Sequence, residues 1–150
     1  MHRILFVCHG NICRSPMAEC VMKDLVARKG LEGNFWINSA ATSTEEIGNP
    51  IHQGTRQKLA EAGVPVCRHR AVRMEKADYA CYDLILGMDG ANIRNIFCIL
   101  GDDPEGKVKR LLDFSARPRD IADPWYTGNF DATYDDIVEG CTALLAALRE

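Results

Sequence analysis

Four short apolar runs along the chain have the length and the residue types of buried β-strands. They lie at about residues 3–8, 34–40, 83–88 and 107–113. The first of them contains Ile4-Leu5-Phe6-Val7 and directly precedes the segment that carries most of the chemistry discussed below.

Between these runs, apolar residues recur at the spacing of amphipathic helices. After Met17, for example, Ala18, Val21 and Leu25 fall at helical intervals, and Gly30 supplies a C-terminal stop. A glycine at position 63 ends the second helical segment in the same way. The predicted helices cover Met17–Lys29, Ile51–Ala62, Met74–Ala80, Ala91–Cys98 and Ala132–Leu148.

Strands that alternate with helices are typical of an α/β fold with a parallel sheet. We therefore predict a three-layer sandwich with a small four-stranded parallel sheet in flavodoxin-like strand order. A chain of 150 residues without a visible linker is expected to form a single domain over residues 1–150. Ligands of such sheets bind at the carboxyl ends of the strands, which directs attention to the loop after the first strand.

Composition narrows the classes of partner. A formal net charge of −3 and a pI near 5.8 argue against nonspecific nucleic-acid binding, and the sequence shows neither a Lys/Arg stripe nor an interleaved set of aromatic residues. The N-terminal apolar run is too short for a signal peptide, and no segment approaches the length of a membrane span. We expect a cytoplasmic protein that binds neither nucleic acid nor membrane.

The cysteines do not suggest a disulfide framework or a zinc site. Their number is odd and no Cys-x-x-Cys pair exists, so we expect most of them to be buried apolar residues and no metal to be bound. Cys8 and Cys13 share one loop, and we hypothesise that a reversible disulfide between them protects Cys8 from over-oxidation. The seven cysteines are Cys8, Cys13, Cys20, Cys67, Cys81, Cys98 and Cys141.

The segment CHGNICRSP, which starts at Cys8, joins the first predicted strand to the first predicted helix. A short loop at such a junction points backbone N–H groups inward, and the helix N-terminus adds its positive dipole end, so the loop is suited to binding an anion. Arg14 adds a planar fork that holds two phosphate oxygens. Cys8 then lies beneath the phosphorus, where the arginine and the dipole favour its thiolate. Phosphate-ester hydrolysis through a thiol needs this arrangement.

Other residues of the loop support the same interpretation. The Ser15 hydroxyl is suited to hydrogen-bonding the thiolate, and Gly10 supplies the backbone freedom of a tight loop. Pro16 suits a first helical turn. The alternative is that Cys8 is a buried structural cysteine, followed by a helix with a favourable N-terminal sequence. This alternative does not explain why all of these residue types occur together in one loop.

Expulsion of an aryl oxygen calls for a proton donor, which contributes roughly 10²–10⁴ in rate. The best candidate is Asp123, because Pro124 favours an extended conformation for it and the two aromatic residues that follow form a wall beside it. A turn that only docks these aromatic residues on the core explains the segment equally well. No metal or cofactor is required by this scheme. The other carboxylates considered are Asp113, Asp120 and Asp131.

With both segments in view, the chain resembles the low-molecular-weight protein tyrosine phosphatases from end to end. The resemblance implies that Cys8 is the nucleophile, Arg14 the clamp on the phosphate and the transition state, and Asp123 the general acid. The matching segments are CHGNICRSPMAE from residue 8, NSAATS from residue 38, GNP from residue 48, LGMDGANI from residue 86 and DPWY from residue 123.

The resemblance also implies a set of supporting residues. Asn11, Ser39 and His69 correspond to positions that brace the loop through hydrogen bonds. The substrate is expected to be a phosphotyrosine-bearing protein or a small aryl phosphate, bound by a monomer or weak dimer. The residues expected to contact the phosphate or line the pocket are His9, Gly10, Asn11, Ile12, Cys13, Ser15, Glu45, Trp125 and Tyr126.

Three positions depart from the pattern of the family. Glu45 stands where eukaryotic members often have an aromatic residue. A glutamate at this position is expected to weaken stacking on a phosphotyrosine ring. Trp125 replaces a more usual tyrosine and keeps an aromatic surface. Val72 stands where an arginine is common, with Arg73 next to it.

Three other functions remain to be weighed. Protein-arginine phosphatases resemble the chain but carry threonine at the position of Ile12. Thioredoxin-coupled arsenate reductases need two resolving cysteines at the end of the third strand, whereas Cys81 precedes that strand and Cys98 follows it at a distance. A noncatalytic phosphate-binding module would keep Arg14 and have no use for Cys8.

Overall fold

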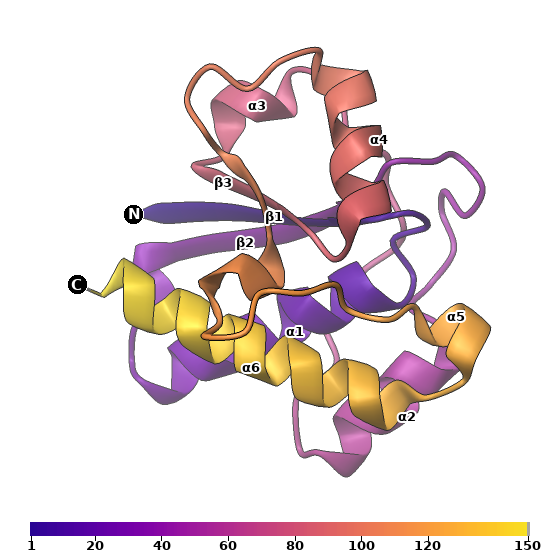
Figure 1. The fold of residues 1–150 in the computed structure, drawn as a ribbon. Helices are drawn as coiled ribbons and strands as arrows, with labels where there is room; N and C mark the ends of the chain where they lie inside the picture. Colours follow the sequence, from indigo (N-terminus) through magenta and orange to yellow (C-terminus); the bar gives the residue numbers. More distant parts are fainter. Residues whose placement is uncertain (150) are drawn as a thin grey trace.

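A parallel sheet forms the middle layer of the structure, a computed structural model that describes residues 1–149 (Figure 1). Its strands are β1 (His2–Cys8), β2 (Phe35–Ala41), β3 (Leu84–Gly87) and β4 (Val108–Arg110). They pair in the order β2-β1-β3-β4, and every pairing is parallel. The predicted α/β fold with four parallel strands in flavodoxin-like order is confirmed.

Helices cover both faces of this sheet. They are α1 (Arg14–Arg28), α2 (Gln53–Glu61), α3 (Asp78–Cys81), α4 (Gly90–Leu100), α5 (Pro124–Thr127) and α6 (Phe130–Leu148), with short 3-10 turns η1 (Glu32–Asn34) and η2 (Leu111–Phe114). α1 packs on one face together with α6 and α2, whereas α3 and α4 lie over the other (Figure 1). Within residues 1–149, no helix has the length and apolar character needed to cross a membrane.

Two predicted elements are wrong in part. The strand predicted at 107–113 stops at Arg110, because the next four residues form η2, whose two leucines are buried. The helix predicted over Met74–Ala80 is reduced to α3, because the Met74 N–H donates to the Ala41 carbonyl at 2.7 Å and holds the chain extended beside β2. The other four predicted helices are present, with ends that differ by up to three residues.

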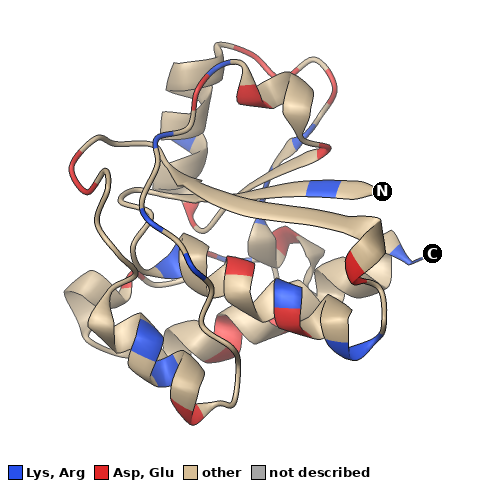
Figure 2. Ribbon diagram, turned by 180° about the vertical axis from the view of Figure 1, so that it is seen from behind, with Lys and Arg blue, Asp and Glu red and all other residues tan. Residues whose placement is uncertain are grey.

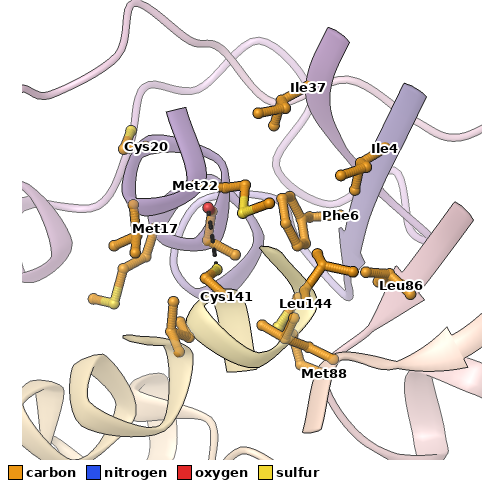
Figure 3. Packing of buried hydrophobic residues seen from close by; sticks show 14 of the residues in the cluster. Ile4, Phe6, Met17, Cys20, Met22, Ile37, Leu86, Met88, Cys141 and Leu144 are labelled. Carbon is orange, nitrogen blue, oxygen red and sulfur yellow. Dashed lines mark hydrogen bonds between the residues drawn. The ribbon is translucent and has the colours of Figure 1, made fainter. Parts of the chain in front are cut away.

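Alternate residues of β1 face opposite sides of the sheet, and this alternation decides where Cys8 lies. Ile4, Phe6 and Cys8 belong to the larger core cluster, which includes residues of α1 and α6 (Figure 3). Leu5 and Val7 belong to the smaller cluster on the α4 side. The Cys8 side chain therefore leaves the strand on the α1 side, close to the first turn of that helix.

The carboxyl ends of three strands lie at the same edge of the sheet. Cys8 pairs with Ala41, and Val7 pairs with Gly87, so β1, β2 and β3 end almost level. The segments that follow these strands thus begin side by side, as expected of a ligand site in a parallel sheet.

Candidate active site

The loop between β1 and α1 places two polar groups on the Cys8 sulfur. The Asn11 N–H donates to Cys8 Sγ at 3.3 Å, and Ser15 Oγ lies 2.9 Å from the same sulfur. Ser15 Oγ also accepts a hydrogen bond from Asn11 Nδ2 at 2.8 Å, which leaves its own proton available to the sulfur. The thiol is only 4% exposed, so these contacts operate away from bulk water.

Asn11 holds this loop in shape. Its φ of 60° is the only positive φ of a non-glycine residue among residues 1–149. Asn11 Oδ1 accepts hydrogen bonds from His69 Nε2 at 2.7 Å and from the Val72 N–H at 3.1 Å, while Nδ2 donates to Ser39 Oγ at 2.9 Å as well as to Ser15. Asparagine adopts this backbone region more readily than most residues, and here its side chain is fixed by four partners. The structure brings the three predicted bracing residues together.

The Glu19 carboxylate contacts two of the residues that hold Asn11, and we call Asn11, Ser39 and His69 the brace of the loop. Ser39 Oγ donates to Glu19 Oε1 at 2.6 Å, and His69 Nδ1 lies 3.6 Å from the same oxygen. Burial lowers the pKa of His69 below its ordinary value, although the nearby Glu19 carboxylate opposes the shift. His69 is therefore held as a neutral imidazole at neutral pH.

Arg14 is the first residue of α1 and is almost completely buried. Its Nη1 donates to Asp89 Oδ2 at 2.6 Å and to the Ile121 carbonyl at 2.8 Å, and its Nη2 lies 3.4 Å from Asp123 Oδ2. Burial disfavours the charged guanidinium, but Cys8, Asp89 and Asp123 outweigh it and raise the pKa of Arg14. The guanidinium is thus a fixed positive charge beside the thiol.

Asp123 lies at the N-terminus of α5, in the extended conformation predicted from the following proline. One carboxylate oxygen accepts from the Trp125 N–H at 3.0 Å, and the other faces Arg14. The segment is a single helical turn, but the alternative in which this turn only docks its aromatic residues on the core is wrong: Trp125 and Tyr126 are exposed, and the turn brings the Asp123 carboxylate to Arg14.

The other carboxylates considered for the acid are bound elsewhere. Asp113 and Asp120 both pair with Arg110, and Asp131 pairs with Lys58. Among the four candidates, Asp123 is the one in contact with Arg14.

These groups surround a cavity of about 110 Å³. A volume of this size accommodates a small anion together with a few waters. The residues that line it are Cys8, His9, Gly10, Asn11, Ile12, Cys13, Arg14, Glu45, Glu46, Asp123, Trp125 and Tyr126.

The rim of the cavity is exposed on two sides. Trp125 and Tyr126 are 56% and 84% exposed, and the Trp125 ring meets the edge of the His52 ring at 5.6 Å between centroids. On another side, His9 Nε2 lies 2.7 Å from Glu45 Oε2. His9 thus lies at the pocket mouth, as favoured from the sequence, and Glu45 is tied to it.

Ile12 and Cys13 form a small buried cluster with Ala71, on the segment that carries the brace. Burial and the neighbouring Cys8 raise the pKa of Cys13 to about 12, so Cys13 is a thiol at neutral pH. The disulfide between Cys8 and Cys13 stays a hypothesis.

Within residues 1–149 all seven cysteines are free, and no group of three His, Cys, Asp or Glu side chains is placed to hold a metal ion.

Sequence reasoning missed two carboxylates of this network. Asp89 was seen only as part of a matching segment, yet it pairs with Arg14 and also caps α4 by accepting from the Asn92 N–H at 2.8 Å. Glu19 is buried at 3% exposure behind the Asn11 brace. The signal for Asp89 was its position just after β3, at the strand edge where β1 ends. Glu19 is the last residue of the matching segment that starts at Cys8, but nothing in the sequence indicates that it lies behind Asn11.

The family model for low molecular weight phosphotyrosine protein phosphatase matches residues 3–150. The chain belongs to this family. A low molecular weight protein-tyrosine-phosphatase of Bacillus subtilis, YfkJ, is 41% identical over 152 residues, which cover 100% of this chain and 97% of YfkJ. PtpA of Staphylococcus aureus is 34% identical over 143 residues, covering 95% of this chain and 90% of PtpA.

Solved structures agree with this membership in the low-molecular-weight phosphatase family. The crystal structure of Bacillus subtilis YfkJ is similar with a TM-score of 0.94, over 99% of this chain and 95% of that one. The structure of an arginine phosphatase from Drosophila is also similar, with a TM-score of 0.87 and 29% identity over 98% of each chain. The scaffold alone therefore does not separate the two kinds of substrate.

Proposed function

We propose that this phosphatase hydrolyses phosphotyrosine in proteins, and small aryl phosphates, through a covalent phosphocysteine on Cys8. One observation carries the proposal. The Cys8 thiol, the Arg14 guanidinium and the Asp123 carboxylate line the same cavity of about 110 Å³.

In the binding step, the phosphate group enters the loop between β1 and α1. Backbone N–H groups of this loop and the N-terminus of α1 attract its oxygens. Arg14 Nη2 faces Asp123 at a long 3.4 Å, so a phosphate oxygen competes well for this donor, while Nη1 keeps its bonds to Asp89 and the Ile121 carbonyl. The clamp is therefore held in orientation by one nitrogen while the other is available to substrate.

In the first chemical step, the Cys8 thiolate attacks phosphorus and a P–S bond forms as the P–O bond to the aryl oxygen breaks. Asp123 in its protonated form gives its proton to that oxygen, which leaves as the phenol. Ser15 and the Asn11 N–H contact the sulfur and stabilise its negative charge before attack.

In the second step, the Asp123 carboxylate removes a proton from water, and the water oxygen attacks phosphorus. The P–S bond breaks, inorganic phosphate leaves, and the Cys8 thiolate is restored. The same carboxyl group thus acts as acid and then as base.

Two local features of the pocket favour an aryl ester over a phosphorylated arginine. Ile12 lines the cavity with an apolar side chain and offers no hydroxyl to orient attack on an N-linked phosphate. Exposed Trp125 and Tyr126 provide aromatic surfaces at the rim for a phosphotyrosine ring.

A reductase relay has weaker support, because Cys81 and Cys98 are both exposed on separate helices.

Turnover of an aryl phosphate in the presence of a chelator tests the mechanism. Cys8→Ser is expected to abolish turnover, because a serine hydroxyl is far less nucleophilic. Asp123→Ala is expected to lower kcat by about 10²–10⁴ for phenyl phosphate and by less for a nitrophenyl ester, whose leaving group needs less protonation. Retained activity in Cys8→Ser contradicts the mechanism.

Competition between matched phosphotyrosine and phosphoarginine peptides tests the substrate class. We expect the phosphotyrosine peptide to be consumed first. Ile12→Thr serves as the paired variant, and a preference for phosphoarginine in the wild-type protein contradicts the proposal.

A further inference from the structure

A group of exposed cations lies beside the phosphate site without carboxylate partners. Some surface arginines of the chain are paired with carboxylates, for example Arg3 with Asp83 and Arg119 with Asp136 and Glu139. Other cations have no such partner, and a group of these lies on α2 and on the connection from α2 to α3. Five exposed residues there form no ion pair with any carboxylate of residues 1–149, and we call them the basic face: Arg56, Arg68, Arg70, Arg73 and Lys76.

Extended backbone explains why Arg68 and Arg70 both face solvent. The segment 68–74 makes isolated bridges, in which Arg70 pairs with Pro50 and Arg73 with Ala41. In extended chain neighbouring side chains alternate, so His69 and Ala71 turn toward the phosphate loop and leave Arg68 and Arg70 in solvent.

The row is visible from the back of the molecule. Figure 2 shows several blue positions spaced along the long connection that follows α2. The expectation that the chain has no Lys/Arg stripe therefore needs correction. The row is not evident in the linear sequence, because uncharged residues that include His69 and Ala71 separate the arginines.

Two hollows follow the basic face. One, of about 540 Å³, is lined by Arg56, Arg68 and Arg70 and by no acidic residue. The other, of about 660 Å³, is lined by Arg73 and Lys76, with Glu75 as its one acidic residue, and also by His9. Because His9 lines the phosphate cavity too, the second hollow begins at the rim of the site.

We propose that the basic face binds acidic side chains that flank the phosphotyrosine of a protein substrate. This inference rests on the function proposed above. A polypeptide whose phosphotyrosine occupies the cavity lays its neighbouring residues on the surrounding surface. Carboxylates there match the guanidinium groups of the basic face in charge and geometry.

The charges around the site give this docking a direction. Glu45 and Glu46 line the phosphate cavity and repel an acidic segment that leaves on their side. His9 pairs with Glu45 and also lines the second hollow, where Arg73 and Lys76 attract an acidic segment. The two hollows of the basic face have no Phe, Tyr or Trp in their lining, so they lack the large stacking platforms of a single-stranded nucleic-acid site.

Paired phosphotyrosine peptides test the proposal, one with Asp and Glu on both sides of the phosphotyrosine and one with Gln and Ala. In the wild-type protein we expect kcat/KM to be roughly three- to tenfold higher for the acidic peptide, mainly through KM, because several exposed ion pairs contribute a little each. The difference should shrink as salt rises from about 50 to about 300 mM.

The double variant Arg68→Glu/Arg73→Glu is expected to lose this preference while nitrophenyl phosphate kinetics stay unchanged, which also shows that the variant is folded. The matched control is Lys29→Glu/Lys109→Glu, which makes the same change in net charge at two other exposed cations without ion pairs in residues 1–149. The control is expected to keep the preference.

Several outcomes overturn the proposal. They are equal kcat/KM for both peptides in the wild-type protein, an equal loss of preference in the control, and inhibition of peptide turnover by an oligonucleotide that exceeds inhibition by polyglutamate. Turnover of nitrophenyl phosphate with no turnover of either peptide overturns the proposed protein substrate itself, and the docking role with it.

Discussion

The phosphate loop and the acid segment meet in one cavity but are built in opposite ways. Every residue from Asn11 to Ser15 is buried, and one side chain in that loop is held by four hydrogen bonds. The α5 turn exposes both of its aromatic residues, and its acid meets Arg14 at 3.4 Å. The proposed anion site is thus fixed before substrate arrives, whereas the proposed acid, Asp123, lies on a sparsely packed turn.

The largest effect is expected from weakening the clamp that joins the two regions. Arg14→Lys keeps the charge but cannot serve Asp89, the Ile121 carbonyl and a phosphate at once. We expect kcat/KM for an aryl phosphate to fall about 10²–10³-fold, the range seen when one preorganised donor to a transition state is lost. Activity within threefold of wild type would show that the loop binds phosphate without needing the planar guanidinium group of Arg14.

The next largest effect is expected from substituting Asn11, whose side chain holds the phosphate loop in shape. Asn11→Ala removes four hydrogen bonds and leaves two of its partners, buried Ser39 and partly buried His69, less satisfied. We expect the free energy of unfolding, measured in urea, to fall by about 3 kcal/mol. Asn11→Gly is the matched control, because it relieves the backbone strain and recovers about 1 kcal/mol of this loss. Equal stability of the two variants would show that strain at this position is negligible.

A smaller effect is expected from pH, again on the phosphate-loop side. The pKa of buried His69 is lowered in the folded state, so the unfolded chain binds more protons between that pKa and the ordinary value near 6.5. The contribution of neutral His69 to stability is therefore full above the ordinary value and is lost as pH falls through the lowered pKa. Urea midpoints should show a shallower decline in His69→Gln, and an unchanged decline would assign the pH dependence to other groups.

The smallest effect is expected on the acid side. Trp125 is 56% exposed, so Trp125→Ala should change the free energy of unfolding by no more than about 0.5 kcal/mol. KM for a phosphotyrosine peptide should rise a few-fold through lost contact with the ring, with kcat for nitrophenyl phosphate nearly unchanged. A tenfold loss of kcat would instead show that Trp125 positions the acid.

Sequence reasoning went furthest where the chemistry is contiguous. Cys8, Arg14 and Ser15 lie within one strand-loop-helix junction, so their spacing alone predicts a shared anion site. Asp123 was found through its proline and aromatic neighbours, but the sequence gives no sign that its carboxylate faces Arg14. That contact depends on how the chain between β4 and α6 crosses the strand edge.

The features that were missed depend on contacts between distant segments. Asp89 reaches Arg14 across 75 positions of sequence, and Glu19 supports Ser39 from the buried side of α1. The helix predicted from Met74 failed because pairing with the end of β2 outweighed local propensity. Each of these outcomes was decided by tertiary partners that periodicity does not report.

The bond from Arg14 Nη1 to the Ile121 carbonyl links the clamp to the chain two residues before Asp123. Clamp and acid therefore share one anchor, and a change in the orientation of the guanidinium moves the backbone that carries the carboxyl group. In a double-mutant cycle, substitutions at Arg14 and Asp123 will not be additive. Energetically the two residues form a single unit, although they lie at opposite ends of the chain.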